Sequence, residues 1–184
     1  WGNKVSEALK RVEILKEANV TWLEEPFYSD AFDEYSQLNK ISSLPLAGGE
    51  SCHSVESAKN MIKYGNVKFI QIDAGIAGGI LAGKDIAKFA EENDVQYVNH
   101  TFTSHLQLSA SLQSYAGSLK SKLAEYPMQL KSLAWDITKN HIIMDKDGYI
   151  NTPSDIGHGM IINEDALFKY KVDVEIKVNQ KKIF

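Results

Sequence analysis

Five polar side chains recur at nearly even intervals along the chain, each one to three residues after a short apolar run. They are Glu24, Glu50, Asp73, His100 and Glu125, separated by 23 to 27 residues. Carboxylates and imidazoles bind divalent cations and move protons. If the apolar runs are neighbouring parallel strands, about 4.8 Å apart, the five side chains face one mouth. We therefore interpret them as one candidate active site.

Two kinds of chemistry are available to this set. Glu24 and Glu50 would be adjacent carboxylates, which repel each other unless a cation lies between them. Mg²⁺ suits such a pair because it takes a few carboxylates together with water and substrate oxygens. Asp73 and His100 end the next two strands, so a carboxylate–imidazole contact is available there. Such a contact fixes the imidazole tautomer and leaves the other nitrogen as a general base or acid.

Each acid taken alone also has a structural interpretation. An acidic side chain at a strand end can cap the helix that follows it. A lone histidine at a strand end is more often structural than catalytic. Five polar residues in register, four of them acidic, favour a shared site over separate caps.

The elements that must position these side chains alternate between strand and helix patterns. Apolar residues at helical spacing predict helices over residues 5–19, 33–41, 54–64, 78–93 and 106–115. Short apolar runs predict strands over residues 20–23, 44–47, 67–72, 95–98 and 123–124. Strands that alternate with helices through short connections are typical of a parallel sheet.

The near-even period indicates an internal repeat of one β/α unit. A doubly wound sheet is an alternative, but the even period favours consecutive neighbours in a (β/α) barrel, which has eight units in about 250 residues. We therefore predict an α/β fold, a partial TIM-type barrel of about five units over residues 1–127. Residues 128–184 form a C-terminal segment, with β-like runs at 141–144 and 160–162 and a turn at Asp147-Gly148.

The composition excludes several classes of protein. The 184 residues are 43% hydrophobic and 24% charged, with a net charge of −4, as expected for one soluble globular domain. The aromatic and aliphatic content excludes disorder, and no apolar stretch approaches the roughly 20 residues of a spanning helix. The acidic balance argues against a nucleic-acid or membrane partner. The single Cys52 cannot form an internal disulfide, so we expect a cytoplasmic protein.

Five motifs, taken in order, resemble the mandelate racemase/muconate lactonizing enzyme family of the enolase superfamily. The resemblance covers nearly the whole chain, and the combination is far more specific than any single motif. The motifs are Trp22-Leu23-Glu24-Glu25-Pro26, Ala47-Gly48-Gly49-Glu50, Gln71-Ile72-Asp73 with Gly78-Gly79, Asn99-His100-Thr101 and Ala124-Glu125-Tyr126-Pro127.

The resemblance implies a role for each of the five polar residues. Glu24 and Glu50 would be two of three Mg²⁺ ligands, and Asp73 and His100 would be the dyad of the mandelate racemase subgroup. Glu125 would lie near the substrate carboxylate as a hydrogen-bonding electrophile. The muconate lactonizing subgroup, which uses a lysine, fits less well because Ile76-Ala77 precede the glycine pair.

The chemistry implied by the resemblance starts with a proton next to a carboxylate. Mg²⁺ would stabilise the enediolate left by its removal, and His100 would remove that proton or donate one to a departing hydroxide. The expected substrate is a sugar acid, and the expected reaction is dehydration to a 2-keto-3-deoxy acid. Racemisation, epimerisation or cycloisomerisation are alternatives within the family. An inactive fragment or a non-catalytic homologue is the alternative of another class.

The resemblance also implies that part of the machinery lies elsewhere. In the family, a first metal ligand and an opposite-face lysine precede the residues that resemble Trp1-Gly2-Asn3, and residues 128–184 run back to a capping domain. We therefore expect the C-terminal portion of a longer enzyme. Open edges of a parallel sheet must be covered, so we also expect a homo-oligomer or further chain at these edges.

An incomplete ligand set predicts that the polypeptide alone binds Mg²⁺ weakly and does not turn over substrate. Isothermal titration calorimetry with MgCl₂ measures the binding, and the full-length parent protein is the control. Tight binding by the 184-residue chain would contradict the prediction.

Overall fold

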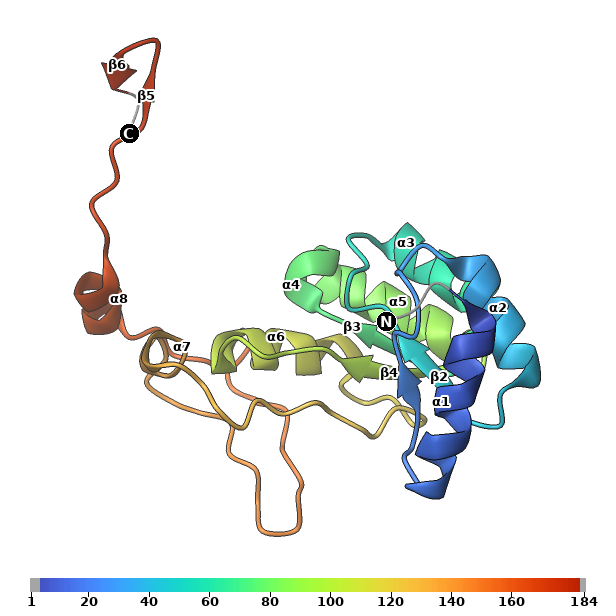
Figure 1. The fold of residues 1–184 in the computed structure, drawn as a ribbon. Helices are drawn as coiled ribbons and strands as arrows, with labels where there is room; N and C mark the ends of the chain where they lie inside the picture. Colours follow the sequence, from blue (N-terminus) through green and yellow to red (C-terminus); the bar gives the residue numbers. More distant parts are fainter. Residues whose placement is uncertain (1–3, 183–184) are drawn as a thin grey trace.

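A four-stranded parallel sheet forms the centre of the fold (Figure 1). The computed structural model describes residues 4–182, so the expectation that involves Trp1-Gly2-Asn3 lies outside the described residues. The strands are β1 (Leu23–Glu24), β2 (Leu46–Gly48), β3 (Phe69–Ile72) and β4 (Gln96–Asn99).

The strand order decides between the two sheet arrangements that the repeat left open. The order is β1-β2-β3-β4, and each neighbouring pair is parallel. A doubly wound sheet reverses its order at a switch point, whereas neighbouring units of a (β/α) barrel follow one another in sequence. The α/β class and the consecutive order are confirmed. Closure into a barrel stays a prediction.

The helices predicted between the strands are present, with ends shifted by a few residues. Serine caps begin two of them, because Ser54 Oγ accepts from Ser57 N and Ser104 Oγ accepts from Gln107 N. Helix α4 was not predicted. The elements are α1 (Val5–Glu17), α2 (Phe32–Ile41), α3 (Val55–Asn60), the π-helical η1 (Met61–Gly65), α4 (Ala74–Ala77), α5 (Ile80–Glu92) and α6 (His105–Tyr115).

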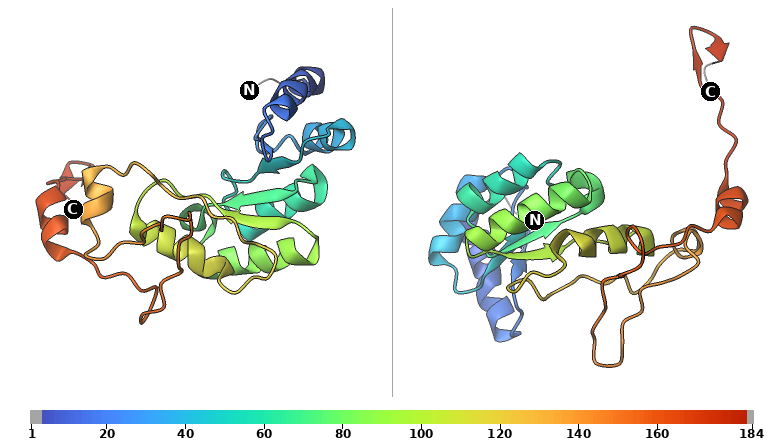
Figure 2. Two further views of the ribbon diagram at one scale, coloured as in Figure 1. Left: turned by 90° about the horizontal axis from the view of Figure 1, so that it is seen from below. Right: turned by 180° about the vertical axis from the view of Figure 1, so that it is seen from behind.

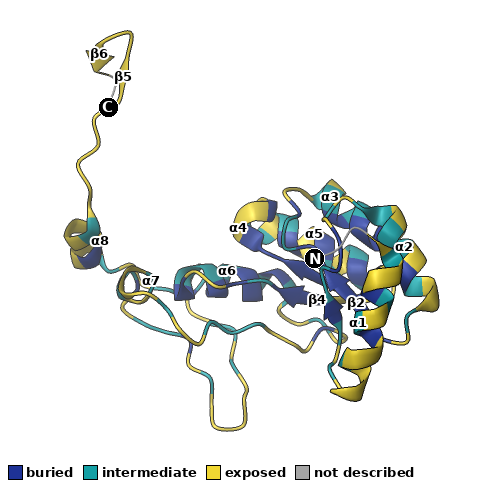
Figure 3. Cartoon of the chain, viewed as in Figure 1, coloured by how far each residue is buried: buried dark blue, intermediate teal, exposed yellow. Residues whose placement is uncertain are grey.

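The two faces of the sheet bury different partners, because successive side chains of a strand point to opposite faces. One face packs against α1, α2, α3 and α5 and forms the main core, and Figure 3 shows buried positions along these elements. The other face carries a smaller cluster of strand residues, Ala47, Phe69 and Val98, with Trp22 packed against it. The Trp22 and Phe69 rings are 4.7 Å apart between centroids.

The predicted fifth strand at residues 123–124 is wrong. Along the free edge of β4, hydrogen bonds that involve side chains take the place of backbone hydrogen bonds to a fifth strand. Tyr97 N donates to Ser121 Oγ at 2.9 Å. The Asn99 amide donates to Glu125 O at 3.0 Å and accepts from Glu125 N at 3.1 Å. The segment therefore lies beside β4 without becoming a strand.

The C-terminal segment also differs from the sequence prediction. Residues 141–144 are not a strand, and Ile162 makes an isolated antiparallel bridge to Thr138. The turn at Asp147-Gly148 is confirmed, with Gly148 N donating to Asp145 O at 3.1 Å. The elements in this segment are α7 (Ser132–Asp136), α8 (Glu164–Tyr170) and the antiparallel strands β5 (Lys177–Val178) and β6 (Lys181–Lys182).

Part of this segment packs against α6. Leu108 and Leu112 of α6 form a buried cluster with Ile142, and Gln113 Nε2 donates to Pro153 O at 2.7 Å. Helix α8 and the β5–β6 pair extend away from the sheet in both views of Figure 2. The division of the chain between residues 127 and 128 stays a prediction. Every helix within residues 4–182 is too short or too polar to cross a bilayer.

We predict that Gly83→Ala destabilises the contact between α5 and α6. A Cβ at Gly83 would lie 2.7 Å from Ser114 Cβ and 3.1 Å from the Tyr97 hydroxyl. Alanine favours an exposed helix by about 0.5–1 kcal/mol over glycine, but overpacking costs about 1–3 kcal/mol. Urea denaturation should show a net loss of stability. Lys84→Ala, at the next, exposed position of α5, is the control and should change stability little.

Candidate active site

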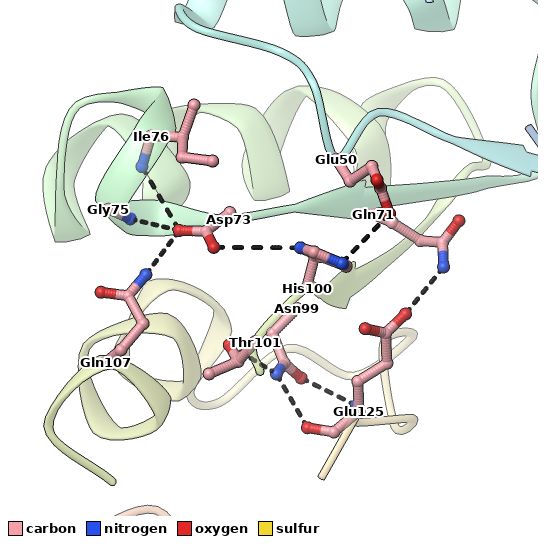
Figure 4. A network of polar contacts seen from close by, with 10 residues as sticks. All are labelled: Glu50, Gln71, Asp73, Gly75, Ile76, Asn99, His100, Thr101, Gln107 and Glu125. Carbon is pink, nitrogen blue, oxygen red and sulfur yellow. Dashed lines mark hydrogen bonds and ion pairs between the residues drawn. The ribbon is translucent and has the colours of Figure 1, made fainter. Parts of the chain in front are cut away.

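The sheet brings the five predicted residues to one edge. Glu24 is the last residue of β1, and Glu50 follows β2 by two residues. Asp73 and His100 directly follow β3 and β4, and the Asn99 contacts hold Glu125 beside them. Because parallel strands share their carboxyl edge, these side chains lie close to one another, and Figure 4 shows four of them together.

His100 lies between two carboxylates. Its Nε2 is 3.1 Å from Glu50 Oε2, and its Nδ1 is 3.8 Å from Asp73 Oδ2. The second distance is that of an ion pair, beyond a hydrogen bond. Asp73 contributes most to raising the pKa of His100, with smaller contributions from the charges of Glu125 and Glu50, while burial opposes the rise. The carboxylates therefore stabilise the protonated imidazole, which makes the neutral ring a stronger base.

Asp73 both caps the helix that follows it and faces His100, so the structural and the catalytic interpretation of a strand-end acid apply to it together. Its Oδ1 caps α4 by accepting from Gly75 N at 2.8 Å and from Ile76 N at 3.3 Å. Gln107 Nε2 of α6 donates to the same oxygen at 2.5 Å. The other oxygen, Oδ2, faces His100. The cap thus fixes the carboxylate while one oxygen stays directed at the imidazole.

Glu24 and Glu125 are joined through Gln71. Gln71 Nε2 donates to Glu24 Oε2 at 2.8 Å and to Glu125 Oε1 at 2.7 Å. Trp22 Nε1 donates to the same Glu24 oxygen at 3.1 Å. Burial raises the pKa of Glu125, the Gln71 bond opposes that rise, and the charge of Glu24 adds to it. Glu125 is therefore a carboxyl that gains a proton more readily than an exposed glutamate.

The sequence motifs contain Gln71 and Asn99, but sequence reasoning gave these two buried amides no role in the site. Asn99 is fully buried, and its Oδ1 also accepts from the Tyr115 hydroxyl at 2.9 Å. Both amides hold Glu125, Gln71 through the carboxylate and Asn99 through the backbone. A period of two along β3 puts Gln71 on the same face as Asp73. A polar residue on that face of an apolar strand was the signal that could have found Gln71.

The residues present fit a partial Mg²⁺ site. Within residues 4–182, no group of three or more His, Cys, Asp or Glu is arranged to hold a metal ion. Glu24 and Glu50 would supply two carboxylates, which suits a cation that completes its shell with water and substrate oxygens. Carboxylates are crowded here: burial raises the pKa of the adjacent Glu25, and the charges of Glu50 and Glu24 add to the rise. A cation would relieve that repulsion.

A family model described as "Enolase C-terminal domain-like" matches residues 1–166. The chain belongs to this family. The match confirms the resemblance that the strand-end motifs carried. Solved structures similar to this enolase-type domain include mandelate racemase/muconate lactonizing enzyme proteins.

Three individual proteins show how far the similarity extends. A predicted mandelate racemase from Rhodobacter sphaeroides is 41% identical with a TM-score of 0.92, over 100% of this chain and 47% of that one. D-Galactarolactone cycloisomerase of Agrobacterium fabrum is 26% identical, over 93% of this chain and 47% of its own length. D-Galactonate dehydratase of Variovorax paradoxus is 28% identical, over 79% and 40%. The chain thus spans about half the length of these relatives or less.

We predict that Asp73→Asn lowers the pKa of His100, because Asp73 contributes most to raising it from 6.5. The amide keeps an oxygen for the cap of α4 but removes the charge. In the native protein, a raised imidazole pKa stabilises the fold below pH 6.5, and this contribution is lost as the pH rises through the higher folded-state pKa.

NMR titration of the His100 ring protons measures this change. Asp94→Asn is the control, because Asp94 is an exposed aspartate that pairs with Lys120. An unchanged His100 titration in the Asp73 variant would contradict the assignment of Asp73 as its main partner.

Proposed function

We propose that this chain is the catalytic C-terminal part of a Mg²⁺-dependent enzyme that removes the α-proton of a sugar-acid carboxylate. The observation that carries the proposal is the His100 imidazole, which lies between Asp73 and Glu50 at the carboxyl edge of the sheet. Family membership supports it, because enolase-superfamily sites combine a Lys or His base with Mg²⁺. Residues 1–127 carry the site in this proposal, and residues 128–184 lead toward a capping domain outside this chain.

Each residue of the site has a distinct task in the proposal. Glu24 and Glu50 would hold Mg²⁺, which when bound supplies positive charge opposite the developing enediolate. His100 Nε2 takes the α-proton, and the Asp73 carboxylate stabilises the resulting imidazolium. Glu125, whose pKa burial raises, donates a hydrogen bond to a substrate carboxylate oxygen as that oxygen gains charge.

Dehydration completes the first candidate reaction. The bond from the β-carbon to its hydroxyl oxygen breaks as the enediolate electrons form a carbon–carbon double bond. The leaving oxygen takes a proton from the His100 imidazolium and departs as water, and the enol product tautomerises to a 2-keto-3-deoxy acid. Similarity to proteins named D-galactonate dehydratase supports this outcome.

Cycloisomerisation is the second candidate. It is favoured by the match over 93% of the chain to D-galactarolactone cycloisomerase. Both reactions start with loss of the same α-proton, and they differ in whether a hydroxyl or a lactone-ring oxygen leaves.

The full-length parent protein with Mg²⁺ tests the proposal against a panel of sugar acids and their lactones in D₂O. We expect ¹H NMR to show loss of the α-proton signal and formation of a keto acid, either by loss of water from a sugar acid or by opening of a lactone ring to a carboxylate. His100→Asn should lower the rate by about 10²- to 10⁴-fold, the usual contribution of a general acid–base group.

His53→Asn is the matched control, because His53 is an exposed histidine in the loop after Glu50. It should keep the parent rate. Full turnover by the His100 variant would favour a non-catalytic role for this imidazole. Absence of α-proton exchange with every substrate in the parent protein would reject the proposed chemistry.

A further inference from the structure

The buried side chain of Gln71 uses both of its N–H donors on carboxylates of the site. Gln71 lies on β3 and is 1% exposed. A side-chain amide carries two N–H groups, and Nε2 donates to Glu24 Oε2 at 2.8 Å and to Glu125 Oε1 at 2.7 Å. Figure 4 shows the contact with Glu125. The two carboxylates, which come from residues 101 positions apart in sequence, therefore share one donor group.

The bond to Glu125 distinguishes the two oxygens of that carboxyl. A protonated carboxyl accepts hydrogen bonds through its carbonyl oxygen and donates through its hydroxyl. Because Gln71 donates to Oε1, the proton of a neutral Glu125 belongs on Oε2. The Asn99 contacts hold the backbone of Glu125 beside β4. With the backbone fixed, the hydrogen bond from Gln71 orients the Glu125 carboxyl.

Packing alone does not account for an amide at this position. The neighbouring side chains on this face, Phe69 of β3 and Val98 of β4, belong to an apolar cluster. A methionine has nearly the same length and would avoid the cost of burying a polar group. The amide at this position is explained by its two donors, which hold the Glu24 and Glu125 carboxylates at a fixed separation.

We propose that Gln71 is a positioning residue that couples Glu24 to Glu125. Its amide presents Glu125 to the substrate through Oε2 and makes the orientation of Glu125 depend on that of Glu24. This inference rests on the proposed function, which gives Glu24 and Glu125 their roles. A change at the metal side of the site is thereby transmitted to the group that donates to the substrate.

Gln71→Met in the full-length protein removes both donors at nearly constant size. We expect kcat to fall by about 10- to 100-fold, the usual effect of losing a group that orients metal ligands. KM should change much less, because the Glu125 contact gains strength in the transition state. Calorimetric titration should also show weaker Mg²⁺ binding. Gln96→Met, the same change at an exposed position of β4, is the control and should leave all three values unchanged.

A second variant covers the case in which Gln71→Met does not fold. Gln71→Glu keeps the shape of the side chain but replaces the two donors with a third carboxyl between Glu24 and Glu125. We expect a loss of kcat at least as large as for the methionine variant. Parent-like kcat and Mg²⁺ affinity in either folded variant would overturn the coupling.

The amide protons of Gln71 give a readout that does not depend on turnover. In ¹⁵N-labelled protein, their signals are identified by their absence in Gln71→Met. We expect both protons to exchange slowly with water. Glu125→Gln should shift one of them strongly, and Glu24→Gln should shift the other. Rapid exchange of both protons, or no shift in either variant, would reject the shared bond.

These outcomes separate the two proposals. A parent protein that enolises no sugar acid removes the proposed function, while the NMR experiment still tests the shared amide. If the parent protein is active and Gln71→Met is equally active, the proposed coupling through Gln71 is rejected and the proposed function stands.

Discussion

Crowding of negative charge at one edge of the sheet is the constraint on which the described site depends. Four parallel strands in consecutive order bring Glu24, Glu50 and Asp73 to the same edge, and the chain then returns to place Glu125 beside them. Carboxylates this close repel each other, and hydrogen-bond donors directed at their oxygens offset that repulsion. The structure supplies indole, amide, backbone N–H and imidazole donors, each directed at a particular carboxylate oxygen. The acids are thus organised by their partners as much as by the strands.

One face of the sheet contributes most of the stability of the fold, and the other face leads to the candidate site. The face against the helices carries most of the buried apolar side chains and supplies most of the burial that stabilises the fold. The opposite face has the small cluster around Phe69 and leads directly to Gln71 and the strand ends. Because alternate residues of one strand serve the two faces, Ile70 and Ile72 can anchor β3 in the core while Gln71 points into the site.

The sequence was most informative where local signals and tertiary structure agree. A polar residue after each apolar run placed Glu24, Asp73 and His100 at strand ends, and the even spacing predicted their common edge. The sequence could not show that Asn99 takes over the bonds of a fifth strand, because that depends on a side chain and a segment far apart in the chain. Helix α4 was missed because four residues are too few for a helical period. Gln71 was quoted in a motif but given no role, since its two partners become neighbours only on folding.

The two hydrogen bonds between the Asn99 side chain and the Glu125 backbone affect how such a site can change during evolution. The backbone of Glu125 is held beside β4 by the side chain of Asn99, and residues 121–127 lie outside any strand, so no sheet ladder fixes their register. The hydrogen bonds that hold Glu125 come from Asn99 and Gln71, and none of them comes from the segment that follows it. The residues that line this side of the site can thus change in the course of evolution while the Glu125 carboxyl keeps its position.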